Sequence, residues 1–332
     1  QGINGWAHGF MVFDLPGGYR GYGHLGDTLS FHSALVVVPE LGLGVFVATN
    51  GETGAKLADR LPDALVRQFY APPATFPRRG SAELLDAAGA FAGDYLSTRR
   101  ASGGLEGFVG LIAGAAEVTV TPGGRLITHR MDETRAWVPE GPVSQGRFIA
   151  AAGDGRLAFH MDGGRAVSFR PDINTETLQR AGFSQRLSTL AVMAVLTALA
   201  AVMTLMGLAL RSRRELRQNQ IQARAALLQN IQAGLWIVAF ALFGAWGAGA
   251  SNLSTIMYGW PGPLIITAST CALVAAALSL ITIAALPAIW QGGRRVDSWS
   301  ATRKVFFTLT VLIYTAFSVL LAMNGALEPW SG

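Results

Sequence analysis

The side chains best suited to chemistry lie close together in this chain, between Gly21 and Ser33. The segment reads Gly-Tyr-Gly-His-Leu-Gly-Asp-Thr-Leu-Ser-Phe-His-Ser. Its Gly21-x-Gly23-x-x-Gly26 spacing formally matches a dinucleotide-binding fingerprint, but that fingerprint needs a helix directly after it, whose N-terminus holds the pyrophosphate. A strand-like run follows here instead, so we predict no nucleotide cofactor.

The other histidines form no pattern of a metal site. His129 and His160 fall in predicted strands, and no second ligand stands at metal-binding spacing near either of them. We interpret both as strand residues, and His8 and His32 as structural residues. We therefore predict neither a metal ion nor an organic cofactor.

Strand-like runs surround this segment and would position it in a sheet. The runs are Trp6–Phe13, Tyr19–His24, His32–Val38 and Leu43–Thr49. The last two are apolar and β-branched, and Pro39-Glu40-Leu41-Gly42 joins them, a composition typical of a hairpin. An antiparallel sheet is therefore expected here.

A helix should cover that sheet. Within Gly54–Tyr70, an apolar residue recurs at four-residue spacing, which predicts a helix with one apolar face. The residues of this face are Leu57, Leu61, Leu65 and Phe69. Sheet and helix make residues 1–70 an α+β domain, and three prolines predict an extended linker over residues 71–80.

Residues 81–183 form a second predicted domain. A short helical stretch, Ala82–Ala90, precedes strand-sized runs that glycine-rich turns separate, and this spacing indicates a small antiparallel β-barrel or meander. The runs are Val118–Val120, Leu126–His129, Ala136–Val138, Arg147–Ala150, Leu157–His160 and Val167–Phe169. No catalytic group of residues stands out in this part of the sequence.

Four long apolar runs in residues 184–332 predict a four-helix transmembrane bundle. Each run is long enough, at about 1.5 Å per residue, to cross a hydrocarbon core of about 30 Å. The runs are Leu187–Leu210, Gln232–Ala250, Leu264–Trp290 and Val305–Leu327. The lipid bilayer is thus a predicted partner of the chain.

Basic residues between these runs predict how the bundle is oriented. Short loops rich in Lys and Arg stay on the cytoplasmic side of a membrane. We therefore expect loops 211–231 and 291–304 to be cytoplasmic and residues 1–186 to be periplasmic or extracellular. The basic residues are Arg211, Arg213, Arg214, Arg217 and Arg224 in the first loop, and Arg294, Arg295, Arg303 and Lys304 in the second.

Charge and cysteine content exclude two further classes of protein. The chain has a net charge of +5, but the basic excess lies in the two loops, and the rest has nearly equal numbers of basic and acidic residues. Such a surface offers no basic stripe to nucleic acid. The only cysteine, Cys271, lies in an apolar run, so an intrachain disulfide cannot form.

Residues 4–50 resemble the C-terminal part of the serine beta-lactamase-like hydrolases, which include class C beta-lactamases, D-alanyl-D-alanine carboxypeptidases, D-aminopeptidases and esterases. The resemblance rests on Gly-x-Gly-His24-x-Gly26-x-Thr28-x-x-Phe31-His32-Ser33, followed by Pro39-Glu-x-Gly-Leu-Gly-Val-Phe-Val-x-Thr-Asn50. It covers about the first 70 residues. The barrel-like domain and the apolar runs also resemble the tail of larger, membrane-anchored members.

The resemblance implies roles for four neighbouring residues. His24 and Gly26 would occupy a His-x-Gly triplet that lines the active site on a sheet-edge strand. His24 would orient a substrate carboxylate or assist proton transfer, and Gly26 would let substrate lie close to the strand. The backbone N–H of Asp27 would belong to the oxyanion hole, and Thr28 would contact substrate. Leu25, Asp27, Leu29 and Ser30 depart from the smaller residues and proline common at these positions.

The family's nucleophile motif is missing from this sequence. It is Ser-x-x-Lys, in which the lysine activates the serine, and a Tyr-x-Asn triplet adds a proton-transfer group. The only lysines, Lys56 and Lys304, follow Thr53 and Ala301 at that spacing, and no Tyr-x-Asn occurs. The expectation is that the chain is the C-terminal part of a longer protein and is inactive alone.

Together these features predict a membrane-anchored, beta-lactamase-related serine hydrolase that acts on a small peptide, an ester or a beta-lactam-like substrate through an acyl-serine. An alternative stays open at this point: a non-catalytic module that binds or senses cell-wall peptides on a membrane anchor. An intact Ser-x-x-Lys upstream would favour the enzyme, and its replacement would favour the binding module.

Overall fold

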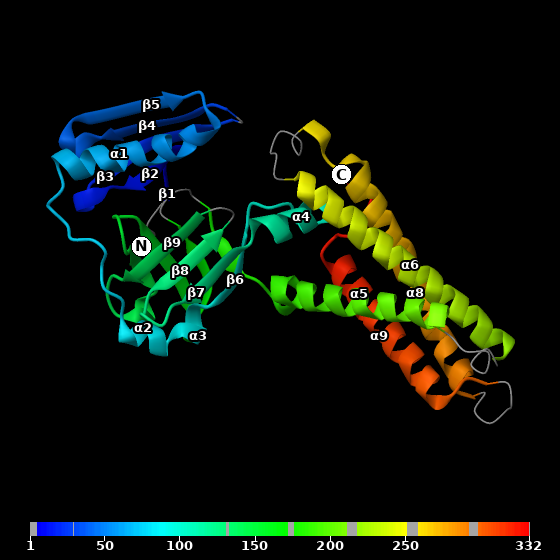
Figure 1. Ribbon diagram of the computed structural model, residues 1–332. Coiled ribbons are helices and arrows are strands. Elements are labelled where there is room, and N and C mark those ends of the chain that lie inside the picture. Colours follow the sequence, from blue (N-terminus) through cyan, green and yellow to red (C-terminus); the bar gives the residue numbers. More distant parts are fainter. Residues whose placement is uncertain are drawn as a thin grey trace. The chain divides into compact units, whose positions relative to one another are not determined.

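A computed structural model describes residues 5–28, 30–130, 133–171, 176–210, 218–250, 258–291 and 298–331. The chain divides into two compact units (Figure 1). The first comprises residues 1–100 and 113–181, and the second comprises residues 101–112 and 182–332.

The first unit begins with a five-stranded sheet in the order β1-β2-β3-β4-β5, antiparallel at every step (Figure 1). The strands are β1 (Gly5–Ala7), β2 (Phe10–Asp14), β3 (Arg20–Asp27), β4 (His32–Val38) and β5 (Leu43–Thr49). The predicted hairpin is confirmed: β4 and β5 pair along their whole length, and Gly42 closes the turn with φ +59°. The prediction of one strand over Trp6–Phe13 is wrong, because His8 and Gly9 have positive φ and form a tight turn between β1 and β2.

Helix α1 (Ala55–Phe69) covers one face of this sheet. Its side chains Ala58, Pro62 and Val66 are buried, and Val66 packs with Val36, Val38 and Leu15. The predicted apolar face is wrong in its position, since Leu57 is 53% exposed and Phe69 is 71% exposed. The buried stripe is one residue further along, because its smaller side chains let the helix lie close to the sheet.

The rest of the first unit is a closed, eight-stranded antiparallel barrel, which confirms the predicted small barrel. Short helices α2 (Ala82–Asp86) and α3 (Ala88–Phe91) precede it. Its core includes Trp137, Phe148 and Tyr95, all almost fully buried. The strands are β6 (Gly93–Ser97), β7 (Ala116–Val120), β8 (Leu126–Arg130), β9 (Glu133–Pro139), β10 (Arg147–Ala150), β11 (Arg156–Asp162), β12 (Arg165–Arg170) and β13 (Leu178–Arg180). Sequence analysis missed β6 and β13, whose pairing closes the barrel.

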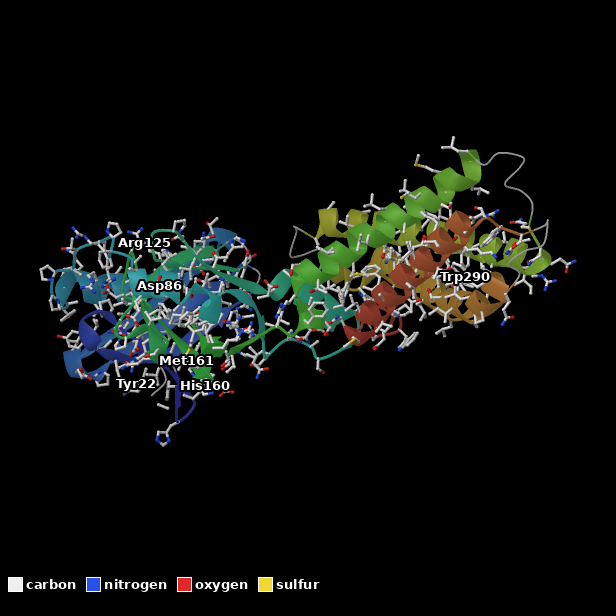
Figure 2. All side chains as sticks on the ribbon, turned by 90° about the horizontal axis from the view of Figure 1, so that it is seen from below. Tyr22, Asp86, Arg125, His160, Met161 and Trp290 are labelled. Atoms are coloured by element: carbon white, nitrogen blue, oxygen red, sulfur yellow. The ribbon has the colours of Figure 1, made fainter. Side chains whose placement is uncertain are left out.

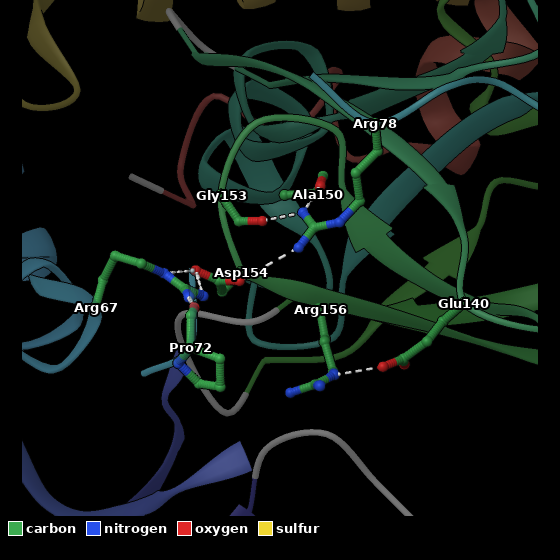
Figure 3. A network of polar contacts seen from close by, with 8 residues as sticks. All are labelled: Arg67, Pro72, Arg78, Glu140, Ala150, Gly153, Asp154 and Arg156. Atoms are coloured by element: carbon green, nitrogen blue, oxygen red, sulfur yellow. Dashed lines mark hydrogen bonds and ion pairs between the residues drawn. The ribbon is translucent and has the colours of Figure 1, made fainter. Parts of the chain in front are cut away.

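Two arginines hold the proline-rich linker of the first unit to one carboxylate (Figure 3). The Nε of Arg67, on α1, donates to Asp154 at 2.7 Å, and the Nη2 of Arg78, in the linker, donates to the other oxygen of Asp154 at 3.3 Å. Arg67 also donates to the carbonyl of Pro72 at 2.7 Å, and Arg78 to the carbonyl of Ala150 at 2.6 Å. The Asp154 side chain is only 14% exposed, so water screens these contacts weakly.

The second unit contains four helices long and apolar enough to cross a membrane. They are α5 (Leu187–Leu210), α6 (Gln220–Gly249), α8 (Gly262–Gln291) and α9 (Ala301–Met323). The same unit contains most of α4 (Gly104–Gly114). In the sequence, α4 lies between the barrel strands β6 and β7. Sequence analysis did not predict α4.

Two of the predicted loops are shorter than expected, because α6 and α9 begin earlier than the apolar runs. Asn219 and Gln222 form a capping box that starts α6, and the Ser300 side chain caps α9. Arg224, Arg303 and Lys304 are therefore helical, not loop residues. The other loop basic residues, Arg211, Arg213, Arg214, Arg217, Arg294 and Arg295, lie outside the described residues.

Candidate active-site strand

The structure places His24 on β3, the middle strand of the five-stranded sheet, so the expectation of a sheet-edge strand is wrong. His24 lies just beyond Gly23, the last β3 residue that pairs with β2. In the strand register, His24 lies opposite Leu35, and both side chains are on the face that α1 does not cover. The ring of His24 is exposed and lies 5.6 Å from the ring of Phe10 and 5.9 Å from the ring of Trp6. Tyr22 is on the same face, two residues earlier in β3. An exposed imidazole with two aromatic rings nearby can reach a ligand that binds on this face.

Glycine is required beside His24 because the strands approach closely. A Cβ on Gly23 would lie 1.7 Å from the carbonyl oxygen of Leu35, so any other residue would push β3 away from β4. Gly26 lies on the His24 face, opposite Ser33, and leaves the surface next to the histidine free of a side chain. The geometry therefore keeps a smooth backbone strip beside the imidazole.

Asp27 directs its side chain away from that face. It lies opposite His32 in the register, on the side of the sheet that α1 covers. Its carboxylate accepts a hydrogen bond from Nδ1 of His32 at 2.7 Å, because an ionised carboxylate can only accept. His32 is 9% exposed, so this contact anchors Asp27 on the helix side. The carboxylate that departs from the family pattern consequently does not occupy the His24 face.

The backbone N–H of Asp27 points along the sheet plane, away from β4. The N–H of Thr28 donates to Phe31 at 2.8 Å, toward the β4 side, and successive N–H groups of a strand point to opposite edges. β2 pairs with β3 from Arg20 only as far as Gly23, so in the described part of the sheet β2 does not cover β3 at Asp27. This donor is thus placed to bind an anionic oxygen at the open edge.

Thr28 lies in the turn after β3, where its side chain is already in use. Its Oγ1 accepts from the backbone N–H of Phe31 at 3.1 Å and donates to the Phe31 carbonyl at 3.3 Å. Thr28 is exposed, but its hydroxyl stabilises the turn. It is the least available of the four predicted site residues.

One ionisable group near Asp27 has a shifted pKa. Burial raises the pKa of the Asp59 carboxyl on α1, and the negative charges of Asp27 and Glu133 raise it further. Arg135 and His32 oppose the shift only in part. The cause is therefore first the loss of water around Asp59 and second the repulsion between neighbouring carboxylates.

The two barrel histidines are on a different sheet from these residues. The His129 ring nitrogen Nδ1 lies 2.8 Å from the Thr134 hydroxyl, and His160 is exposed on β11 (Figure 2). Among the described residues, no group of three or more His, Cys, Asp or Glu side chains could hold a metal ion. Sequence reasoning missed the contact between Asp27 and His32 and the rings of Trp6 and Phe10 beside His24. The spacing of these residues in the sequence gives no sign of these contacts, because the contacts depend on strand register.

Comparison with known proteins gives one family match. Residues 2–68 match the family model described as Beta-lactamase. A search of curated proteins found no match. Among solved structures, the chain is similar to SurE with D-Leu, at 21% identity over 53% of this chain and 39% of that chain, with a TM-score of 0.29.

Two further solved structures are similar at 17% identity, each over 53% of this chain. They are SurE, over 38% of that chain with a TM-score of 0.27, and an octameric penicillin-binding protein homologue from Pyrococcus abyssi, over 37% of that chain with a TM-score of 0.20. The chain thus spans under two-fifths of the length of these structures. The family match itself falls on the β1–β5 sheet and α1, the part of the chain that holds His24.

Proposed function

We propose that this protein is a membrane-anchored serine hydrolase related to beta-lactamases, and that β3 forms one wall of its active site. The match of residues 2–68 to the Beta-lactamase family carries the proposal. The four apolar helices support the anchor, since each is long enough to span a bilayer. The substrate would be a small peptide, an ester or a beta-lactam-like molecule.

The open face of the sheet supports an active site made with further sequence. Besides His24, this face exposes apolar side chains that α1 does not cover, and a sheet of this kind usually packs a second layer on such a face. The exposed apolar residues are Phe10 at 49%, Leu35 at 45%, Val37 at 44% and Phe46 at 70%. We infer that a segment with Ser-x-x-Lys, which residues 1–332 lack, completes the site there.

The chemistry would follow from this arrangement. The serine hydroxyl from that segment attacks the carbonyl carbon of the amide or ester, and the proton passes to the neighbouring base. The N–H of Asp27 stabilises the negative oxygen of the tetrahedral intermediate, which collapses to an acyl-serine as the amine or alcohol leaves. Water then attacks the acyl-serine, which releases the acyl group as a carboxylic acid and regenerates the serine hydroxyl. His24 orients the substrate carboxylate or transfers a proton.

Probe labelling would test the proposal. A fluorescent phosphonate or penicillin, added to membranes that contain the protein as the cell makes it, should label one serine outside residues 1–332. The separately expressed 332-residue chain should stay unlabelled. His24→Ala should slow labelling by about 100-fold, the usual size of a proton-transfer contribution. His129→Ala, on the barrel, is the matched control and should label at the normal rate.

Two results would contradict the proposal. Labelling of a serine within the 332-residue chain would place the nucleophile in residues 1–332. It would contradict the proposal that a further segment supplies it. Absence of serine-dependent labelling in native membranes would favour the alternative, a module that binds or senses cell-wall peptides without catalysis.

A further inference from the structure

An apolar cavity of about 400 Å³ lies within the second unit, at one end of the helical bundle. Its walls come from α4, the first turns of α5 and α8, the second half of α6 and the last turns of α9. The volume falls in the range of roughly 300–1,000 Å³ that is usual for small-molecule sites. Along α5 it extends from Leu187 to Ala194, about 10 Å of helix axis.

The lining of this cavity is almost wholly hydrocarbon. Phenylalanines such as Phe108 and Phe243 form flat walls, and alanines such as Ala268 leave the space between them. Ser269 carries the one hydroxyl group of the lining, and it already donates to the carbonyl oxygen of Ala326 at 2.7 Å. The indole Nε1 of Trp236 is also part of the lining and has no hydrogen-bond partner among the described residues. Apart from this single N–H, a ligand that buried polar atoms here would lose hydrogen bonds to water without replacement, so the lining selects a largely apolar ligand.

Helix α4 is a fixed wall of the cavity. The Phe108 ring lies 5.8 Å from that of Phe243 on α6, and the backbone N–H of Leu105 donates to the Ser331 hydroxyl at 3.1 Å. A Cβ on Gly104 would lie 2.5 Å from that hydroxyl oxygen, which shows how closely the start of α4 packs. A segment inserted in sequence between β6 and β7 therefore contributes one wall of a cavity that the four long helices also line.

We propose that this cavity binds one acyl chain of a bilayer phospholipid. The outward faces of the bundle are apolar and exposed, as at Val192, Leu199 and Leu280, so the surroundings of the cavity are lipid once the helices lie in a membrane. An acyl chain matches a lining that has no charged group and only the Trp236 indole as an unpaired donor, and the bilayer supplies it at high concentration. The inference requires the bundle to lie in a membrane but does not require residues 5–70 to be a hydrolase.

Photo-crosslinking would test it. The full chain is placed in phosphatidylcholine vesicles in which one acyl chain carries a diazirine, and crosslinked residues are mapped by mass spectrometry. Crosslinks should concentrate on α4 and the second half of α6, about fivefold above the outward positions Leu199 and Leu280. Even labelling along the outward faces would show ordinary boundary lipid and overturn the proposal.

Cavity-filling variants sharpen this test. Ala268→Leu, in the wall, and Ala194→Leu, at a half-buried lining position, should each lower crosslinking on α4 by about fivefold. Val274→Leu, 43% exposed on α8, enlarges a side chain by one methylene on an outward face and should change nothing. If Ala268→Leu prevents folding, the crosslinking of Ala194→Leu and the crosslinking map of the wild-type chain still test the proposal. A polyisoprenoid probe that labels the lining better than the acyl probe would overturn the assignment of the ligand.

Discussion

The backbone N–H and the side chain of Asp27 point in different directions. Its N–H lies at the open edge of β3, whereas its carboxylate binds His32 on the α1 side. Asp27→Ala should leave the buried Nδ1 of His32 without an acceptor and lower the free energy of unfolding by about 1 kcal/mol, since Asp27 itself is half exposed. Amide hydrogen exchange of β3 and β4 measures the loss. Ser33→Ala, in the same hairpin, is the control and should change it by less than about 0.5 kcal/mol. Equal effects would show that the contact with His32 is not stabilising.

The raised pKa of Asp59 predicts that removing its charge stabilises the protein, and that the gain in stability depends on pH. A carboxyl whose folded pKa lies above its unfolded value of 3.8 binds its proton more tightly in the folded protein. Stability is therefore lost as pH rises from 3.8 through the folded pKa. Asp59→Asn should raise the thermal unfolding midpoint at pH 7, with a gain below about 1 kcal/mol, and should add little at pH about 3.

An exposed carboxyl provides the control for Asp59. Asp86→Asn, on α2 (Figure 2), removes the same charge from a solvated position and should leave the unfolding midpoint nearly unchanged at both pH values. A gain for Asp59→Asn that is equal at pH 7 and pH about 3 would mean that ionisation of Asp59 is not the cause.

Residue types and spacing predicted that His24, Gly26 and Asp27 belong to one site on a strand. They did not predict which face of the sheet each side chain lies on. Alternation along β3 puts His24 and Gly26 on one face and Asp27 on the other. Which of these faces α1 covers depends on the pairing of β3 with β4 and on the packing of Val36 and Val38 against the helix. These are tertiary facts, and no local pattern in Gly21–Ser33 encodes them.

At the scale of the element, helix α1 allows the observed buried stripe to be tested against the apolar stripe predicted from the sequence. Val66 is fully buried against the sheet, whereas Leu57 is 53% exposed despite its place in the predicted apolar stripe. Val66→Ala should cost roughly 1–3 kcal/mol through lost burial and a residual cavity. Leu57→Ala should cost less than about 0.5 kcal/mol. Chemical denaturation measures both, and a larger loss for Leu57→Ala would restore the stripe predicted from the sequence.

Long, strongly patterned elements were predicted well, and short or glycine-rich ones were not. β4, β5 and α5 begin and end where the sequence places them, because β-branched or apolar runs fill their whole length. β13 has three residues, and barrel closure depends on its pairing with β6, more than 80 positions away in the chain. α4 contains four glycines, which lower its helix propensity, so packing within the second unit stabilises it.

At the scale of the whole molecule, Asp154 ties α1 and the linker to the barrel within the first unit (Figure 3). Asp154→Asn keeps the size of the side chain but removes the charge that Arg67 and Arg78 share. The free energy of unfolding should fall by roughly 1–3 kcal/mol, and proteases should cut residues 71–80 faster. Limited proteolysis measures this, with exposed Asp162→Asn as the control. Unchanged cleavage would mean that the prolines alone keep the linker in place.

The orientation of the bundle is the prediction on which the cellular position of His24 depends. Arg224, Arg303 and Lys304 lie in the first turns of α6 and α9, and the chain enters these helices at the end opposite to the start of α5. Because positively charged ends stay in the cytoplasm, the first unit should lie outside. In a Cys271→Ala background, a membrane-impermeant maleimide should label His160→Cys in intact cells. It should label Ala301→Cys only after permeabilisation. The reverse pattern would place the His24 face in the cytoplasm, away from any cell-wall peptide, and would remove that class of substrate.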